Sequence, residues 1–191
     1  MKAVLMSIQP KWCELIASGK KTVEVRKTKP KIDVPFKCYI YCTKGEHLWK
    51  TKSRVFLDGA YNRIIDNLPD YLLNGKVIGE FVCDKIECFT TDYRANVEQT
   101  KRISEQSCVS LFDLEDYECG SNCLFGWHIT DLVIYDKPKE LSEFHRPCEE
   151  TENCLNKNFR EAGHCLDKCF DCGNSITRPP QSWCYVEERE Q

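Results

Sequence analysis

A short segment near the start of the chain carries residues that can bind and polarise a ligand. Lys21, Glu24 and Arg26 lie within six residues of one another, in the sequence SGKKTVEVRK. Polar and apolar residues alternate from Thr22 to Arg26, which predicts a half-buried strand with Glu24 and Arg26 on one face, about 7 Å apart. Lys21, at the preceding turn, can reach the same cavity. A carboxylate between two cations stays ionised, and the cations can take phosphate or carbonyl oxygens. Routine ion pairs on a solvated strand face are the structural alternative.

The elements around this segment predict an α+β fold. A proline at the first helical turn and a glycine that closes the helix place one helix from Pro10 to Gly19. Short strands with period-two patterning, rather than regular βαβ units, favour a single domain over residues 1–191, built as a small mixed β-barrel with short helices outside. The expected strands are 3–8, 22–26, 36–43, 76–86, 125–135 and 182–187, and short helices are expected within 57–73 and at 111–117 after a Ser110 cap.

The octapeptide from Gly19 to Arg26, GKKTVEVR, resembles the Gly-x-Lys-x-x-Glu-x-Arg signature of ASCH domains. The surrounding order also resembles that family: a first strand, a helix that opens with QPKW, the signature, the segments YIYCT and GKVIGEF, and a strand around Trp127. The resemblance implies a PUA-like β-barrel that binds RNA or a nucleotide-type ligand in a cationic cleft. Lys21, Glu24 and Arg26 would form the floor of that cleft.

The same resemblance leaves an enzymatic alternative open. Some ASCH proteins hydrolyse acetylated cytidine with a Lys, Thr and Glu set, and Lys21 matches the lysine. Glu24 occupies the position of the threonine nucleophile, and a carboxylate cannot replace an activated hydroxyl. The corresponding mechanism would use Glu24 as a general base on water and Lys21 to polarise an amide, with Glu80 as a candidate partner carboxylate.

Further aromatic and polar residues are candidates for lining the cleft. Proteins usually hold an unpaired base by stacking it on an aromatic ring and by hydrogen bonds from amide groups. The diproline at Pro179 and Pro180 fixes the approach of the last strand and favours the residues that follow it. Core packing is the alternative role of the tryptophans at 12 and 127. The candidates are Trp12, Tyr41, Lys44, Trp127, Gln181, Ser182 and Trp183.

A cysteine-rich surface insertion is expected at about 145–178. Five of the chain's 14 cysteines crowd into it, and Cys169 and Cys172 have the spacing of half a tetrahedral zinc site. One structural zinc would stabilise a segment with few apolar residues, whereas free thiols or disulfides are the alternative for such irregular spacings. A zinc-bearing protein-interaction adaptor is therefore a third functional hypothesis. The five candidate ligands are Cys148, Cys154, Cys165, Cys169 and Cys172.

The charge distribution and the hydropathy of the chain bear on its ligands and on its cellular location. The net charge of −3 hides a split, because residues 1–54 carry 13 basic and four acidic residues, a net of +9, and the remainder carries −12. This asymmetry favours one face for polyanions. No apolar stretch approaches the roughly 18 residues of a membrane span, and the N-terminus lacks a secretory pattern. A reducing, cytoplasmic location is therefore expected.

Overall fold

A computed structural model describes residues 2–44, 50–51, 71–92, 96–147 and 175–188. Its strands are β1 (Lys2–Ile8), β2 (Val23–Arg26), β3 (Phe36–Cys42), β4 (Lys50–Thr51), β5 (Tyr71–Leu72), β6 (Val77–Cys83), β7 (Ile86–Phe89), β8 (Leu124–His128), β9 (Thr130–Lys139) and β10 (Trp183–Glu187). The helices are α1 (Pro10–Ala17), α2 (Val97–Ser107), α3 (Leu111–Glu118) and the 3-10 turn η1 (Leu141–Glu143). Most of the short helix expected within 57–73 lies outside the described residues.

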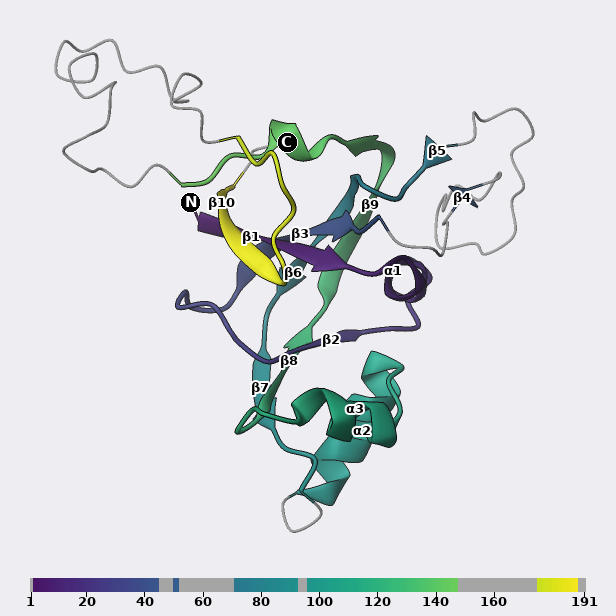
Figure 1. The fold of residues 1–191 in the computed structure, drawn as a ribbon, viewed down its shortest axis with the longest axis vertical. Coiled ribbons are helices and arrows are strands. Elements are labelled where there is room, and N and C mark those ends of the chain that lie inside the picture. Colours follow the sequence, from purple (N-terminus) through teal and green to yellow (C-terminus); the bar gives the residue numbers. More distant parts are fainter. Residues whose placement is uncertain (1, 45–49, 52–70, 93–95, 148–174, 189–191) are drawn as a thin grey trace, which may run out of the picture.

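The strands form two main sheets, which lie one above the other in Figure 1. The upper sheet has the order β10-β1-β3-β6-β9, and the lower has the order β2-β8-β7. β1 and β3 are parallel, and the other neighbours in these sheets are antiparallel. The α+β class is confirmed, but the prediction of a closed barrel is wrong for the described strands: β9 and β10 end the upper sheet as separate edges. Strand periodicity predicts which residues are extended, but it does not predict which strand edges pair with each other.

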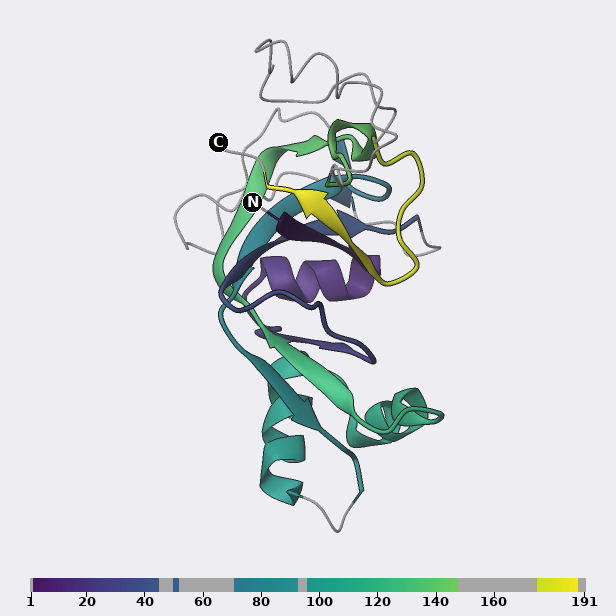
Figure 2. The same ribbon diagram turned by 90° about the vertical axis from the view of Figure 1, so that its left-hand side faces the viewer.

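Two long arms, β6–β7 and β8–β9, connect the two sheets. β6 continues into β7, and β8 continues into β9, so each expected single strand (76–86 and 125–135) is divided between the two sheets. The β8–β9 arm runs the length of the molecule in Figure 2. Gly79 permits the close approach of β6 to β9, because a Cβ placed there would lie 2.4 Å from the carbonyl oxygen of Val133.

α1 lies between the upper sheet and β2, as Figure 2 shows. Its buried face, which includes Cys13 and Ile16, joins a core with Met6 and Ile8 of β1 and Trp127 of β8. The helix begins at Pro10 as predicted, and Gly19 takes the left-handed conformation that closes it, with a φ of 70°. α1 therefore fixes the position of the turn that precedes β2.

A second core joins the lower sheet to α2 and α3. Val23 and Leu124 face Ile103 of α2 and Leu114 of α3, and all four side chains are at most 1% exposed. Ser110 caps α3 as predicted, accepting a hydrogen bond from the backbone N–H of Asp113 at 3.1 Å. Among the described helices, none is long and apolar enough to cross a membrane.

Candidate functional site

Lys21, Glu24 and Arg26 form a buried cluster in which the carboxylate bridges both cations. Lys21 Nζ lies 3.2 Å from Glu24 Oε2, and Arg26 Nη2 lies 2.9 Å from Glu24 Oε1. The three residues are only 2%, 6% and 9% exposed. The low exposure separates this cluster from the routine ion pairs of a solvated strand face, because charges withdrawn from water need mutual compensation.

Strand register and a helix end hold the three side chains in place. Glu24 pairs with Trp127 and Arg26 with Phe125 across the β2–β8 ladder, so both point to the same side of the lower sheet. Lys21 approaches from the α1–β2 turn, where its Nζ donates to the carbonyl oxygen of Ser107 at 2.7 Å. Ser107 is the last residue of α2. The predicted convergence of the three residues is present.

The cluster lines a cleft of about 680 Å³. This volume lies within the range of small-molecule sites, about 300–1,000 Å³. The walls come from the start of α1, from β2, from α3 and from the segment before β10. The lining side chains are Ser7, Gln9, Lys11, Trp12, Lys21, Glu24, Val25, Arg26, Thr43, Val109, Asp113, Leu114, Asp116, Tyr117, Pro179, Pro180 and Gln181.

Trp12 forms a half-buried aromatic wall of the cleft, and two amines lie near its ring. Lys21 Nζ lies 5.1 Å from the centre of the Trp12 ring system and Lys11 Nζ lies 4.3 Å from it. Lys11 is exposed and Lys21 is buried, so Lys11 is the amine that can move aside. A planar ligand that displaces Lys11 would stack on the indole and keep contact with the buried ammonium.

Among the described residues, the charges that line the cleft balance. Its cations are Lys11, Lys21 and Arg26, and its carboxylates are Glu24, Asp113 and Asp116. The two aspartates enter from α3, some 90 residues after the signature. The net positive cleft expected from the basic N-terminal segment is therefore neutral by this count, which favours an uncharged polar group inside it.

Among the described residues, one fully buried donor of the cluster has no hydrogen-bond partner. Arg26 Nη2 donates to the carbonyl oxygen of Ser7 at 2.7 Å, but Arg26 Nε has no hydrogen-bond partner among the described residues. Ser7 also donates from Oγ to the carbonyl oxygen of Pro180 at 2.7 Å, which fixes the segment before β10 against β1. An unpaired buried N–H is costly, so a ligand acceptor that reaches it gains free energy.

The remaining candidate residues divide between the cleft and other places. Gln181 lines the cleft, and Trp183 packs against Trp127 at a ring distance of 5.9 Å without lining it. Ser182 accepts a hydrogen bond from the backbone of Ser7. Tyr41 is 3% exposed in a core on the opposite side of the upper sheet, and Lys44 is exposed outside the cleft. Their roles in ligand binding stay predictions.

Glu80 belongs to another polar group. Its carboxylate lies 3.1 Å from Lys37 Nζ and accepts a hydrogen bond from Tyr135. Glu80 is not among the residues that line the cleft. Glu80 therefore pairs with Lys37 outside the lining of the cleft, and its role as a partner carboxylate stays a prediction.

The five candidate zinc ligands lie outside the described residues, because residues 148–174 do. The zinc site and the cysteine-rich insertion stay predictions. Among the described side chains, no group of three or more His, Cys, Asp or Glu residues could hold a metal ion.

Cys13, below the cleft, has a pKa well above its ordinary value because of burial, its hydrogen bond with Cys42 and the nearby charge of Glu24. It stays a protonated thiol.

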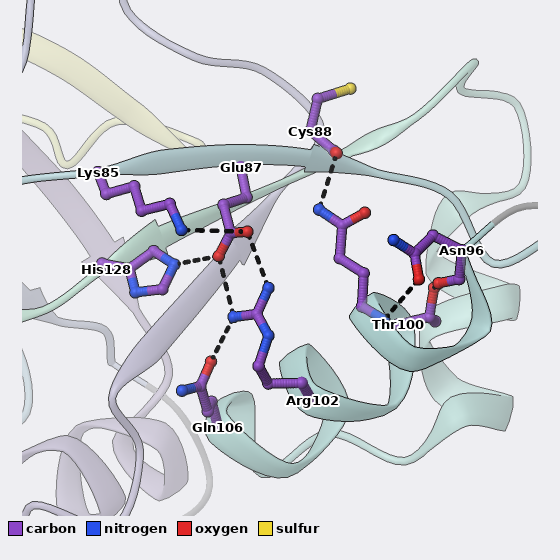
Figure 3. Close-up of polar contacts among 9 residues, drawn as sticks. Lys85, Glu87, Cys88, Asn96, Thr100, Arg102, Gln106 and His128 are labelled. Atoms are coloured by element: carbon purple, nitrogen blue, oxygen red, sulfur yellow. Dashed lines mark hydrogen bonds and ion pairs between the residues drawn. The ribbon is translucent and has the colours of Figure 1, made fainter.

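A cluster around the Glu87 carboxylate, the carboxylate clasp, joins α2 to the lower sheet (Figure 3). α2 ends at Ser107, whose carbonyl oxygen accepts the hydrogen bond from Lys21. Arg102 of α2 donates two hydrogen bonds to Glu87 of β7, from Nη1 at 3.0 Å and from Nη2 at 2.8 Å. His128 and Lys85 contact the same carboxylate at 2.6 and 3.3 Å. The hydrogen bonds from Arg102 lower the pKa of Glu87 to about 2, against the opposing effect of burial, and His128 and Lys85 add to the lowering.

The described strands and helices form a mixed α+β domain with two main sheets, and α1 lies between the upper sheet and β2. The family model for the ASCH domain matches residues 6–128, and the chain belongs to the ASCH domain family. A comparison with curated protein sequences gives no match.

Among solved structures, the crystal structure of ASCH from Zymomonas mobilis is similar with 18% identity and a TM-score of 0.56, over 97% of this chain and 88% of that one. Two of its variants match as well. A serine-to-alanine variant has 17% identity, covering 97% of this chain and 89% of that one, and a tyrosine-to-phenylalanine variant has 18% identity, covering 98% and 92%. Both have a TM-score of 0.56. At this identity the likeness concerns the fold.

Proposed function

We propose that the protein binds RNA or a nucleotide-type ligand by taking one unpaired nucleobase into the cleft. The observation that carries the proposal is the buried carboxylate of Glu24 held between the donors of Lys21 and Arg26. A base edge that presents a donor beside an acceptor complements this set. The carboxylate accepts from an exocyclic amine, and the cations donate to a ring nitrogen or carbonyl oxygen.

Three further features support a base as the ligand. The half-buried ring of Trp12 offers a stacking surface, and base–aromatic stacking contributes about 1–3 kcal/mol. The buried Nε of Arg26 has no acceptor among the residues that the structure describes. The balanced charges of the lining favour a neutral ring over a phosphate inside the cleft. Cytosine, guanine and adenine each carry an exocyclic amine beside a ring acceptor, whereas uracil has no exocyclic amine to donate to Glu24.

Titration calorimetry with cytidine, guanosine, adenosine and uridine tests the proposal. We expect cytidine, guanosine or adenosine to bind more tightly than uridine by about 1–3 kcal/mol, roughly 5-fold to 150-fold. Trp12→Ala and Glu24→Gln should each weaken this binding at least about fivefold, and Glu105→Gln, an exposed carboxamide substitution on α2, should not. Circular dichroism checks that each variant is folded. Equal affinity for all four nucleosides, or no saturable binding, would contradict the proposal.

One observation favours a second candidate function, amide hydrolysis on a modified nucleoside. Glu24 and Lys21 lie 3.2 Å apart inside the cleft, where the carboxylate could take a proton from water and the ammonium could polarise an amide carbonyl. The hydroxide would add to the carbonyl carbon, and the C–N bond would break with the proton passing to the departing amine. Incubation with acetylated cytidine tests this function: cytidine and acetate should form, and Glu24→Gln should abolish their formation.

A further inference from the structure

Three lysines alternate along the loop that leaves the cleft. Lys27, Lys29 and Lys31 all lie exposed in the connection between β2 and β3, which is referred to below as the lysine loop (residues 27–31). This loop contributes three of the basic residues that make the first 54 residues strongly positive. The lysine loop therefore places part of that excess on the surface directly after Arg26, which lines the cleft.

The first two amines of the lysine loop are held in place by rings. Lys27 Nζ lies 5.2 Å from the ring centre of Tyr117 and donates to the carbonyl oxygen of Cys119 at 3.0 Å. Lys29 Nζ lies 5.8 Å from the ring centre of Phe125. Because these contacts restrict the long side chains before any ligand arrives, less side-chain entropy is lost when an anion binds.

The backbone of the lysine loop is fixed as well. Trp183 Nε1 donates to Thr28 Oγ1 at 3.0 Å, and the backbone N–H of Lys31 donates to the hydroxyl of Tyr185 at 2.6 Å. Both partners belong to β10, the edge strand of the upper sheet. These hydrogen bonds to β10 therefore hold the lysine loop in place between the cleft and this edge.

The lysine loop adjoins the cleft. Arg26 lines the cleft and Lys27 follows it directly, while Tyr117, which holds Lys27, also lines the cleft. α3 places Asp113 and Asp116 on the cleft wall, and carboxylates repel phosphate. A polyanion whose base enters the cleft would consequently leave it over the lysine loop.

We propose that the lysine loop binds the phosphates of a single-stranded nucleic acid that flank the base held in the cleft. This inference rests on the proposed function and adds a separate site to it. Affinity then divides between two surfaces: the neutral cleft takes the base, and the loop takes the backbone charge. Phosphate contacts position the strand, and base contacts specify it.

The test is the salt dependence of binding to an eight-nucleotide single strand, measured by fluorescence anisotropy on the RNA and DNA forms. We compare the full chain with K27Q/K29Q/K31Q and with K101Q/K137Q/K139Q, which removes the same charge from α2 and β9. Each phosphate contact contributes about 0.7 to the slope of log K against log salt for single strands, so the loop variant should lose about 2 from the slope. The control variant should keep the slope of the unmodified protein.

Titration with cytidine separates the two claims. The loop variant should bind cytidine as the unmodified protein does, because no lysine of the loop lines the cleft. An unchanged slope in the loop variant, an equal loss in the control, or no binding of the octamer would overturn the phosphate assignment while cytidine binding stands. Failure to bind both cytidine and the octamer would overturn the proposed function together with it. Weaker binding of DNA than RNA would identify the 2′-hydroxyl as part of recognition.

Discussion

Replacing Glu87 by glutamine should destabilise the protein near neutral pH and remove part of its sensitivity to acid. The lowering of its pKa from 4.5 to about 2 corresponds to about 3 kcal/mol, at about 1.4 kcal/mol per pH unit. Arg102 and Lys85 are 41% and 58% exposed, so solvent screening reduces the expected value to about 1–2 kcal/mol.

The direction with pH follows from linkage. A carboxyl whose folded-state pKa is depressed stabilises the protein above 4.5, and this contribution is lost as the pH falls through about 2. The difference in the free energy of unfolding between the unmodified protein and Glu87→Gln should thus be full at pH 7 and less than about half of that at pH 3. Urea unfolding at the two pH values measures it.

Glu105→Gln is the matched control, because Glu105 is an exposed carboxylate on α2, the helix that carries Arg102. It should change the free energy of unfolding by less than about 0.5 kcal/mol at either pH. A loss in Glu87→Gln that is the same at pH 7 and pH 3, or no loss at pH 7, would refute the account of the carboxylate clasp.

Three other predictions concern packing, thiol chemistry and the metal. Gly79→Ala should lower the free energy of unfolding by about 1–3 kcal/mol in a urea titration, because its Cβ would lie 2.4 Å from the carbonyl oxygen of Val133; no loss would show that β6 can move. The hydrogen bond with Cys88 is the main reason that the pKa of Cys123 rises to about 11, so Cys88→Ala should speed alkylation of Cys123 at pH 8, as read by peptide mass spectrometry; an unchanged rate would contradict this. Native mass spectrometry should find one zinc, lost when the cysteines of 148–172 become serine, and a metal-free protein would rule the zinc site out.

Local patterns explain what the sequence could predict. The alternation in β2 placed Glu24 and Arg26 on one face, because pairing fixes side-chain direction with a period of two. Gly19 was predictable as a helix end because its conformation is rare for other residues. These features are decided within a few residues, so they can be read before the fold is known.

The features that escaped prediction depend on distant segments or on a polar buried face. The buried residues of α2 are Thr100, Ile103 and Ser107, two of them polar, so the helix has few apolar residues to mark its buried face. Asp113 and Asp116 reach the cleft only because α3 packs against the lower sheet. No local sequence signal predicts the packing of α3 against the lower sheet. The neutral charge of the cleft lining depends on that packing.

The most direct test of the central claim is a crystal structure of the protein with cytidine bound. The account predicts the base in the cleft, with its amine within hydrogen-bond distance of the Glu24 carboxylate, its ring acceptors facing Lys21 and Arg26, and its ring against Trp12. A saturated complex with cytidine bound elsewhere, or with its sugar rather than its base against Glu24, would contradict the account.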